Sequence, residues 1–537
     1  MAFLRIEKKS SGTYLRIVQS YKVNGVCKHK TLHSLGRVED YPPDQLERIA
    51  KKLLELSGVQ LEDIVAKSFK EINRVNYGYA MIIKRLWDIF KLNDWVMQIK
   101  KHHSVKFNWM EVFQLMLAER LNDPCSKRKN WLHQEEYIGF NGSYDLQHFY
   151  RTLDLLSEEQ ESLKEHLFHQ QRNLFSQSLD VLFYDVTTLY FDSELEEEGN
   201  LRRKGYSKDG KSHKTQIVLG LVVDKLRNPI TYHVYEGNTY EGKTMIDALK
   251  DIKKSYSIDR VIVVADSGMI DKVNRLYMEE QQIDYILGDR IKSLPEDIKR
   301  QLLDRSEHRS MVSIKEGNAE ELSYTTVEYK GRRIIGTYSS KRAKKDAYER
   351  EKLLEKAKQW LSAPSQYRKV TKRGAGRYIC TDAKGMPIQL DAERIKQDAM
   401  YDGFKAIATS TDLPVEEVLS KYRDLYEIEH AFRTLKSQLE IRPIFHWTNK
   451  RIEGHVSMCF VAFTFLNYLR NITHLEVADL VKAMDQMQLS VIKEDQSPEL
   501  VYMRSNIKAN QQQLIDKLQL VVPRDVTPQS IIDQYFK

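Results

Sequence analysis

Two aspartates stand at positions where predicted strands would bring carboxylates to one edge of a sheet. Asp185 lies inside the run LFYDVTTLYF, and Asp266 ends the run VIVVAD. A carboxylate among apolar neighbours is costly to bury unless it is paired or bound to a metal. Open α/β sheets hold their ligand sites at the carboxyl ends of strands. A lone strand-end aspartate is more often a helix cap, but two of them in one predicted sheet favour a metal site.

A third carboxylate is expected from a helix that faces this edge. In KYRDLYEIEHAFRTLKSQLE, four side chains recur at i, i+7, i+11 and i+14: Tyr422, Glu429, Arg433 and Lys436. At about 100° per residue they project from one side of a helix, whereas Glu427 lies roughly 160° away from Glu429. Seen alone, Glu-x-x-x-Arg is a surface ion pair worth roughly 0.3–0.5 kcal/mol. The two aspartates favour a functional interpretation.

The elements around these residues follow the order of an RNase H-like core. Three β-like runs (LDVLFYDVTTLYF, TQIVLGLVVD, PITYHVYEG) precede a helix, the strand RVIVVA, a second helix and the strand IDYILG. This order predicts an α/β fold with a mixed sheet covered by helices. Its first and fourth strands are neighbours, so Asp185 and Asp266 would lie side by side. Residues 291–400 predict a β-rich insertion, after which the sheet resumes at DGFKAIATS and a long helix spans 414–439.

Composition adds weaker constraints. The chain has 537 residues and a net charge of +8, and residues 331–378 hold 15 lysines and arginines against 4 acidic residues. This patch suits a polyphosphate partner, with a solvated helix face as the alternative. The four cysteines are scattered, which argues against a zinc site or a disulfide framework. The apolar run 456–469 is shorter than the roughly 20 residues that span a bilayer. We therefore expect a cytoplasmic protein with no membrane partner.

At this point the chain resembles transposases of bacterial insertion sequences, in the group with the Y-R-E-K signature (insertion-sequence family four). The resemblance rests on YDVTTLYF, GYSKDGKSHKTQIVLGL, VADSGM, Y-x6-E-x6-K and RIEGHVSMCFVAF, and it covers about residues 179–469. It implies that Asp185, Asp266 and Glu429 are catalytic and bind metal. It implies that Tyr422 and Lys436 contact DNA. The arginine expected three residues after the tyrosine is Leu425 here, so Arg433 or Arg423 would have to replace it.

The resemblance also implies the chemistry and the partners. Three carboxylates can hold two Mg²⁺ about 3.5–4 Å apart, and we expect Mn²⁺ to substitute. The expected reaction is cut-and-paste transposition, in which a homodimer on paired ends cleaves double-stranded DNA at terminal inverted repeats and joins it to target DNA. The alternatives are another RNase H-fold nuclease, such as a resolvase, or a DNA-binding descendant without catalytic activity. The protein would act at the bacterial nucleoid.

Further DNA contacts are expected outside the catalytic centre. In the 331–378 patch they are Lys341, Arg342, Lys344 and Lys345. A second group lies in the loop after the first strand: Arg202, Arg203, Lys204, Lys208, Lys211 and Lys214. Within that loop we predict that Arg203 and Lys204 bind DNA. Gln216 is expected to support the metal site, and Trp360 to stack on a flipped base or otherwise to pack in a core.

The expected division of the chain has six parts. They are a β-rich N-terminal module (1–75), a helical DNA-end-binding module (76–177), the first part of the catalytic core (178–290), the insertion (291–400), the second part of the core with the Glu429 helix (401–470) and a helical tail (471–537).

Overall fold

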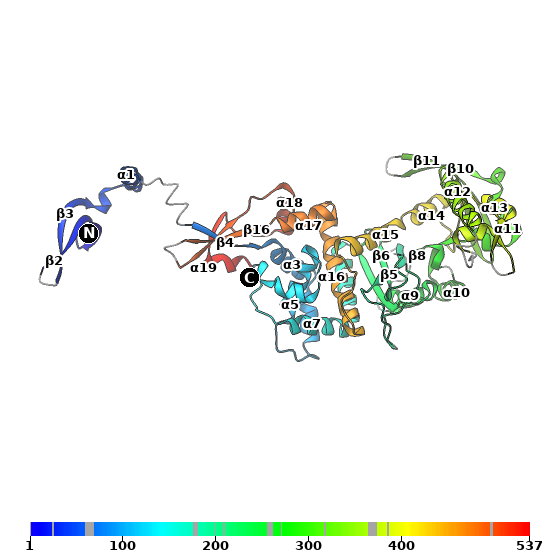
Figure 1. Cartoon of the computed structure of the whole chain (residues 1–537), viewed down its shortest axis with the longest axis horizontal. Coiled ribbons are helices and arrows are strands. Elements are labelled where there is room, and N and C mark those ends of the chain that lie inside the picture. The colour runs from blue at the N-terminus through cyan, green and yellow to red at the C-terminus, as the bar shows by residue number, and fades with distance from the viewer. Residues whose placement is uncertain are drawn as a thin grey trace.

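The computed structural model describes residues 2–23, 26–58, 69–175, 181–197, 199–207, 210–254, 261–269, 271–315, 318–363, 373–383, 386–494 and 498–536. Figure 1 shows an elongated molecule with a small sheet at one end, helices in the middle, and a large sheet leading to the insertion at the other end.

The large sheet has nine strands in the order β10-β11-β12-β15-β9-β8-β5-β6-β7. Its first five strands in the chain are β5 (Val181–Tyr190), β6 (Gln216–Asp224), β7 (Pro229–Glu236), β8 (Ile262–Ala265) and β9 (Asp284–Asp289). β5 pairs antiparallel with β6 and parallel with β8, and β8 pairs parallel with β9. The resulting order, third-second-first-fourth-fifth, confirms the predicted RNase H-like core.

Helices cover both faces of this core, which explains why its strands are apolar throughout. Alternate side chains of β5 point to opposite faces, so Leu182 and Tyr184 pack in one apolar cluster and Phe183 in another. The first cluster is closed by α9 (Met245–Lys254) and α10 (Lys272–Glu280). The second is closed by α15 (Tyr426–Arg433) and α16 (Asn449–Thr473). Asp185 has the parity of Phe183 and so faces the side that α15 covers.

The insertion extends the same sheet. Strand β15 (Phe404–Thr409) pairs with β9, as expected for the point where the sheet resumes, and it also pairs with β12. The added strands are β12 (Arg332–Tyr338), β11 (Asn318–Tyr329) and β10 (Arg309–Lys315). Around them lie α11 (Glu296–Leu303), α12 (Ser340–Ser362), α13 (Ala392–Ala399), β13 (Ile379–Thr381) and β14 (Pro387–Leu390). The insertion is therefore joined to the catalytic sheet through backbone hydrogen bonds.

A helical body packs around one buried helix, α16 (Asn449–Thr473). It consists of α3 (Gly78–Ile89), α4 (Leu92–Ile99), α5 (Trp109–Asn122), α6 (Lys127–Leu132), α7 (Leu146–Glu158) and α8 (Gln160–Phe175). α16 is long and apolar enough to span a membrane by length and composition, but 89% of its most apolar window is buried inside the protein. The prediction of a buried helix over 456–469 is confirmed.

The C-terminal region differs from the predicted helical tail. It contains α17 (Val477–Asp485), α18 (Ala509–Leu518), α19 (Gln529–Ile532), β16 (Gln488–Glu494), β17 (Leu500–Arg504) and β18 (Val526–Pro528). These strands form a four-stranded sheet with β4 (Phe69–Asn76), which we had assigned to the N-terminal module. The cause is the alternation in β16, where Leu489 and Val491 are buried and an apolar face needs a partner strand.

The N-terminal module is a three-stranded antiparallel sheet followed by one helix. Its elements are β1 (Ala2–Lys9), β2 (Gly12–Val23), β3 (Val26–Arg37) and α1 (Pro43–Leu56). The β-rich character of this region and the helix over 43–57 were both predicted. In Figure 1 the module lies apart from the rest of the molecule.

Candidate active site

The register of β5 and β8 brings the two aspartates together. Tyr184 pairs with Ala265, so the next residues, Asp185 and Asp266, are neighbours at the carboxyl end of β8. Asp185 is half-buried, and its Oδ1 accepts a hydrogen bond of 2.7 Å from the Val186 amide; Asp266 is exposed. The two aspartates thus lie side by side on neighbouring strands of the sheet.

Gly288 of β9 lets the Tyr422 hydroxyl approach Asp266, because a larger residue would fill this place. A Cβ atom added there would lie 3.3 Å from Asp266 Oδ1 and would collide with the hydroxyl of Tyr422. The Tyr422 hydroxyl donates to Asp266 Oδ1 over 3.4 Å. Burial raises the pKa of Tyr422 well above its usual range, and the neighbouring Asp266 carboxylate adds to this shift. The phenol therefore stays protonated and remains a donor at neutral pH.

The predicted helix over 414–439 is wrong as one continuous α-helix. The structure has α14 (Val415–Arg423), a tight turn at Asp424 and Leu425, α15 (Tyr426–Arg433) and a π-helical turn (Thr434–Gln438). At the turn the backbone hydrogen bonds span three residues instead of four, because the Leu425 amide donates to the Tyr422 carbonyl. A constant 100° per residue therefore does not hold from Tyr422 to Lys436.

The two glutamates of α15 have different surroundings. Glu427 is 13% exposed and forms an ion pair with Arg227. Glu429 is exposed, and α15 packs on β5 and β6, the strands beside the aspartates. Leu425 packs against the apolar core, so the position at which the resemblance implies an arginine is filled by a partly buried aliphatic side chain. Glu429 is the carboxylate of this helix that is not committed to Arg227.

Lys405 of β15 lies within electrostatic reach of two of the carboxylates. Desolvation lowers its pKa, and Arg342 lowers it further, whereas Asp266 and Glu429 act in the opposite direction. The sequence analysis missed Lys405, although it is the one charged side chain in the strand FKAIAT. Its place beside the aspartates depends on the pairing of β15 with β9, which local sequence does not reveal.

A cleft of about 680 Å³ runs from this edge into the insertion. Six of its lining residues carry the chemistry: Asp266, Arg290, Lys292, Arg342, Lys405 and Tyr422. The whole lining holds six basic side chains (Arg290, Lys292, Arg342, Arg350, Arg377 and Lys405) and six acidic ones (Asp266, Asp289, Asp346, Glu349, Asp398 and Asp402). Lys292 is held by Asp398 at 2.6 Å, and Arg342 lies 3.5 Å from Asp346. The insertion thus contributes side chains of both charges to the cleft beside Asp266.

The basic patch of the insertion is only partly at the surface. Lys341, Lys344 and Lys345 are exposed on α12, in addition to Arg342. In contrast, Arg332 is buried in an ion pair with Asp289. Residues 364–372 of the patch lie outside the described residues. The exposed basic side chains of the patch thus continue along α12 and beyond it, with Lys352, Lys356, Lys358, Arg373 and Arg377.

The basic loop after β5 lies farther from the aspartates than we expected. Gln216, at the base of this loop, pairs with Tyr190, five ladder positions beyond Asp185, or roughly 17 Å along the strand. Its amide donates to the carbonyls of Tyr206 and Gly237 at 2.9 and 2.8 Å. The expectation that Gln216 supports the metal site is wrong, because this side chain holds the loop instead.

Arg202 of this loop and Trp360 of the insertion pack inside the protein. Arg202 is 1% exposed, with its guanidinium 4.3 Å from the centre of the Trp447 ring, so it is not available to DNA. Arg203 pairs with Glu236 at 3.5 Å. The Lys204 side chain is exposed, and Lys208 lies outside the described residues. Trp360 packs with Leu353 and its neighbours in a small cluster of the insertion, which was the alternative to base stacking.

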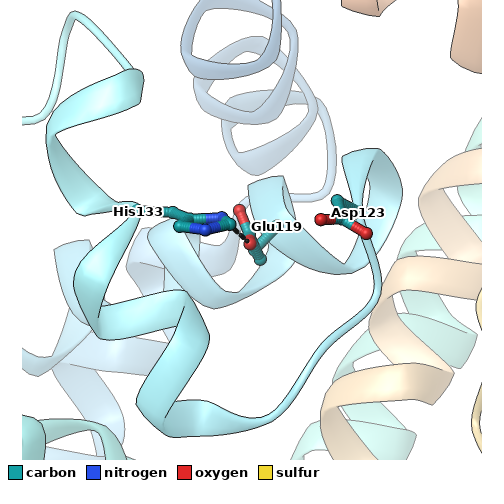
Figure 2. Close-up of side chains that lie close together, drawn as sticks. All are labelled: Glu119, Asp123 and His133. Carbon is teal, nitrogen blue, oxygen red and sulfur yellow. Dashed lines mark hydrogen bonds and ion pairs between the residues drawn. The ribbon is translucent and has the colours of Figure 1, made fainter.

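A second group of side chains that could serve as metal ligands lies in the helical body, for which the sequence analysis predicted no metal site. Glu119, Asp123 and His133 each place one ligand atom within 4.8 Å of the others (Figure 2). However, both oxygens of Glu119 already accept hydrogen bonds, from His133 Nδ1 at 2.8 Å, Cys125 Sγ at 3.2 Å and the Tyr137 hydroxyl at 2.6 Å. Burial and the nearby Glu119 raise the pKa of Cys125 to about 12, so its thiol remains a donor.

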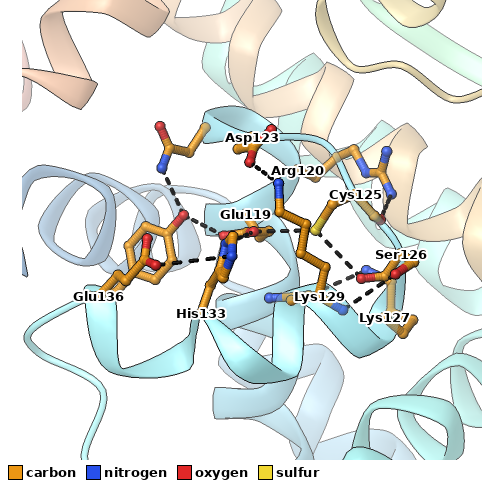
Figure 3. A network of polar contacts seen from close by, with 12 residues as sticks. Glu119, Arg120, Asp123, Cys125, Ser126, Lys127, Lys129, His133 and Glu136 are labelled. Carbon is orange, nitrogen blue, oxygen red and sulfur yellow. Dashed lines mark hydrogen bonds and ion pairs between the residues drawn. The ribbon is translucent and has the colours of Figure 1, made fainter.

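Cations complete this group (Figure 3). Asp123 pairs with Lys129 at 2.5 Å, and the guanidinium of Arg120 donates to the carbonyls of Leu439 and Cys125 at 3.1 Å. The carboxylates are thus balanced by protein donors. We interpret the group as a buried hydrogen-bond network that ties α5 and α6 to the segment after the π-helical turn. Among the described residues it is the only group of three His, Cys, Asp or Glu with ligand atoms this close, so the three predicted catalytic carboxylates stand farther apart.

The strand order and the aspartates at the strand ends define an RNase H-like core of the DDE class. Residues 176–465, more than half of the chain, match the family model described as a transposase DDE domain, and the chain belongs to this family. Residues 4–61 match the N-terminal domain of IS1634 family transposases. Both matches identify an insertion-sequence transposase. Comparison with curated proteins finds no match.

Solved structures give distant matches. A Mos1 transposase paired-end complex with the left transposon end is 13% identical, with a TM-score of 0.15, and the match covers 36% of this chain and 65% of that chain. A pre-cleavage Mos1 transpososome is 13% identical over 36% and 66%, with a TM-score of 0.14. A Mos1 mariner paired-end complex with Mn is 14% identical over 36% and 66%, with a TM-score of 0.14. The chain thus spans just under two thirds of each.

The buried network makes a pH-dependent contribution to stability. Lys127 is 2% exposed, and burial lowers its pKa from 10.5 to about 7. The unfolded chain therefore binds more protons than the folded protein between pH 7 and 10.5, and stability rises across this window. The slope from this group is at most about 1.4 kcal/mol per pH unit. We expect Lys127→Met to flatten the rise.

The measurement is urea unfolding at several pH values from neutral to mildly alkaline. Lys101→Met, which removes an exposed lysine, is the control and should leave the rise in place. A Lys127→Met protein whose stability still climbs as steeply as that of the unchanged protein would contradict the assignment.

Proposed function

We propose that this protein is a cut-and-paste transposase that cleaves double-stranded DNA at the terminal inverted repeats of a bacterial mobile element and joins the ends to target DNA. The observation that carries the proposal is the register that places Asp185 beside Asp266, with Glu429 on the helix over the same face, in a chain of the DDE family. The spacing Y-x6-E-x6-K supports the Y-R-E-K group. We further propose that it acts as a homodimer at the nucleoid.

The three carboxylates fit a pair of hard divalent cations, Mg²⁺ or Mn²⁺. All donors are carboxylate oxygens, which such ions prefer. Among the described residues these carboxylates do not bring their oxygens within 4.8 Å of one another, so a pair of ions would suit them better than a single ion. When bound, the ions would activate the attacking hydroxyl and stabilise the leaving oxygen of an in-line phosphoryl transfer.

The surrounding side chains would orient the DNA strand. Arg342 and Lys405 carry positive charge on the side of Asp266 that faces the cleft, where the scissile phosphate and its neighbour would lie. Tyr422, protonated and 3.4 Å from Asp266, can donate to a phosphate oxygen or keep the carboxylate in place. Because Leu425 is packed in the core, the missing signature arginine must be supplied from elsewhere on this helix.

The first prediction concerns the carboxylates. Asp185→Asn, Asp266→Asn and Glu429→Gln should each lower cleavage on the order of a hundredfold or more, because each removes a charged metal ligand. Binding to element ends should change little. Glu427→Gln is the matched control on the same helix, because Glu427 is committed to Arg227. The measurement is Mg²⁺-dependent cleavage of a labelled end duplex. Any one variant with near-normal cleavage would remove its residue from the site.

The second prediction concerns the basic residues of the helix. We expect Arg433→Ala and Lys436→Ala to impair strand transfer more than end binding. Arg423→Ala should be mild, because Arg423 donates to Ser420 Oγ at 3.2 Å within α14. The assay uses pre-nicked ends, so that cleavage does not limit joining. A severe Arg423→Ala defect beside a mild Arg433→Ala defect would mean that α15 is turned differently on the DNA.

The third prediction concerns α12. Neutralising Lys341, Arg342, Lys344 and Lys345 together should weaken binding to all sequences alike. The slope of log K against log salt should flatten by up to ~0.9 for each DNA phosphate that the variant no longer neutralises. The control replaces Lys250 and Lys253, the exposed lysines of α9, with glutamine. An unchanged slope in the α12 variant would make these residues a solvated helix face.

A further inference from the structure

The N-terminal sheet carries an unusual density of positive charge. Residues 1–37 contain eight lysines and arginines and a single acidic residue, Glu7, which gives a net charge of +7 in a chain whose total is +8. The sheet lies apart from the helical body in Figure 1, so both of its faces are open. Of the described residues in its strands only Val18, at 2% exposure, is buried.

The strand register sorts the side chains onto two different faces. Residues that pair across neighbouring strands point to the same side of a sheet. On one side, Arg5 pairs with Arg16 and Glu7 with Tyr14, and Tyr14 pairs in turn with Arg37. The same side carries Phe3, Lys9, Val18, Ser20, Lys22 and His29. We call this the charged face. The other side carries Leu4, Ile6, Leu15, Ile17 and Tyr21 together with Lys8, Lys28 and Lys30, so it has three basic side chains against five on the charged face.

The centre of the charged face contains an unfavourable pair of like charges. Arg5 and Arg16 stand directly opposite each other, and like charges in such a cross-strand pair are destabilising. Glu7 offsets part of this cost, with its carboxylate 3.4 Å from Arg5, 3.3 Å from Arg16 and 3.8 Å from Lys9. One carboxylate for three cations leaves an excess of positive charge. An anionic ligand on this face would relieve that repulsion.

The dimensions of the face suit duplex DNA. Adjacent strands lie about 4.8 Å apart, so the outer strands of this sheet are separated by roughly 10 Å. The major groove is about 12 Å wide and accepts β-ribbons, and arginine pairs with guanine there through two hydrogen bonds. Arg5 and Arg16 lie at the middle of the face, whereas Lys9, Lys22 and Arg37 lie toward its margins, where groove phosphates would run.

We propose that the charged face of the N-terminal sheet is a DNA-reading surface that docks in a major groove at the element ends, with Arg5 and Arg16 toward the bases and Lys9, Lys22 and Arg37 on phosphates. This rests on the proposed function for the identity of the DNA. It assigns end recognition to β1–β3, whereas the catalytic centre, which lies at the far side of the molecule in Figure 1, provides the chemistry.

The test compares two double variants of the full chain. Arg5→Gln/Arg16→Gln changes the charged face, and Lys28→Gln/Lys30→Gln removes the same charge from the other face of the same sheet. The probes are a fluorescein-labelled 40-bp duplex copied from the DNA flanking the gene and a shuffled duplex of the same composition. Anisotropy is measured over a range of salt concentrations in EDTA, so that no cleavage intervenes. Circular dichroism and thermal melting check that each variant is folded.

We expect Arg5→Gln/Arg16→Gln to weaken binding to the flanking duplex at least tenfold and to lower its preference over the shuffled duplex. The salt slope should fall by up to ~1.8, because the variant has two fewer cations on the DNA. Lys28→Gln/Lys30→Gln should weaken binding less than threefold. If Arg5→Gln/Arg16→Gln does not fold, Lys22→Glu, exposed at the end of β2, is compared with Lys30→Glu in the same way.

Equal effects from the two faces, or no effect from the charged face, would overturn the proposal. Competition by polyglutamate as strong as that by DNA of equal charge would also overturn it, because the face would then be a general site for acidic proteins. Plasmid nicking by the unchanged protein in Mg²⁺ is measured separately. A protein that reads DNA through this face but never nicks it would disprove the proposed catalysis and leave this inference standing.

Discussion

The constraint on which this structure depends is the placement of two carboxylates on neighbouring parallel strands. Asp185 and Asp266 repel each other, and burial increases that cost. The fold limits the cost by leaving Asp266 exposed just beyond the end of β8 and Asp185 half-buried, with a backbone amide as donor. Lys405 and Tyr422 then bring a cation and an O–H donor to the Asp266 side.

The broken helix solves a packing conflict. Leu425 and Ile428 must reach the apolar core, while Glu427 pairs with Arg227 and Glu429 stays exposed. In a straight α-helix from Val415 to Gln438 each residue would be rotated by about 100° from the one before. That fixed rotation would not bring the apolar, ion-paired and exposed side chains all to the sides where they are needed. The tight turn before α15 and the π-helical turn after it change this rotation. Departures from regular helix geometry at such a place indicate that function, in addition to packing, selects the backbone.

Sequence alone predicted the parts of the fold that local pattern determines. The strand order, the two aspartates and the buried helix α16 can be predicted from apolar runs and from the polar and turn residues that bound these runs. What it missed depends on contacts between distant segments. β4 and β16 pair although one precedes and the other follows the catalytic core, and the sequence of neither strand indicates which strand it pairs with. Lys405 approaches Asp266 only because β15 pairs with β9, and Gln216 was misplaced because the length of β5 beyond Asp185 was not considered.

The distribution of charge links the two ends of the molecule. The N-terminal sheet carries a net +7 and residues 331–378 carry +11, which together exceed the total of +8, so the remaining residues carry −10. In Figure 1, β1–β3 and α12 lie at opposite ends of the long axis, with the helical body between them. The helical body itself is nearly neutral, because residues 69–175 carry a net +1 and residues 449–537 a net 0. The negative balance therefore lies mainly in the catalytic core and in the rest of the insertion, and each basic segment attracts a polyanion more strongly than the body between them does.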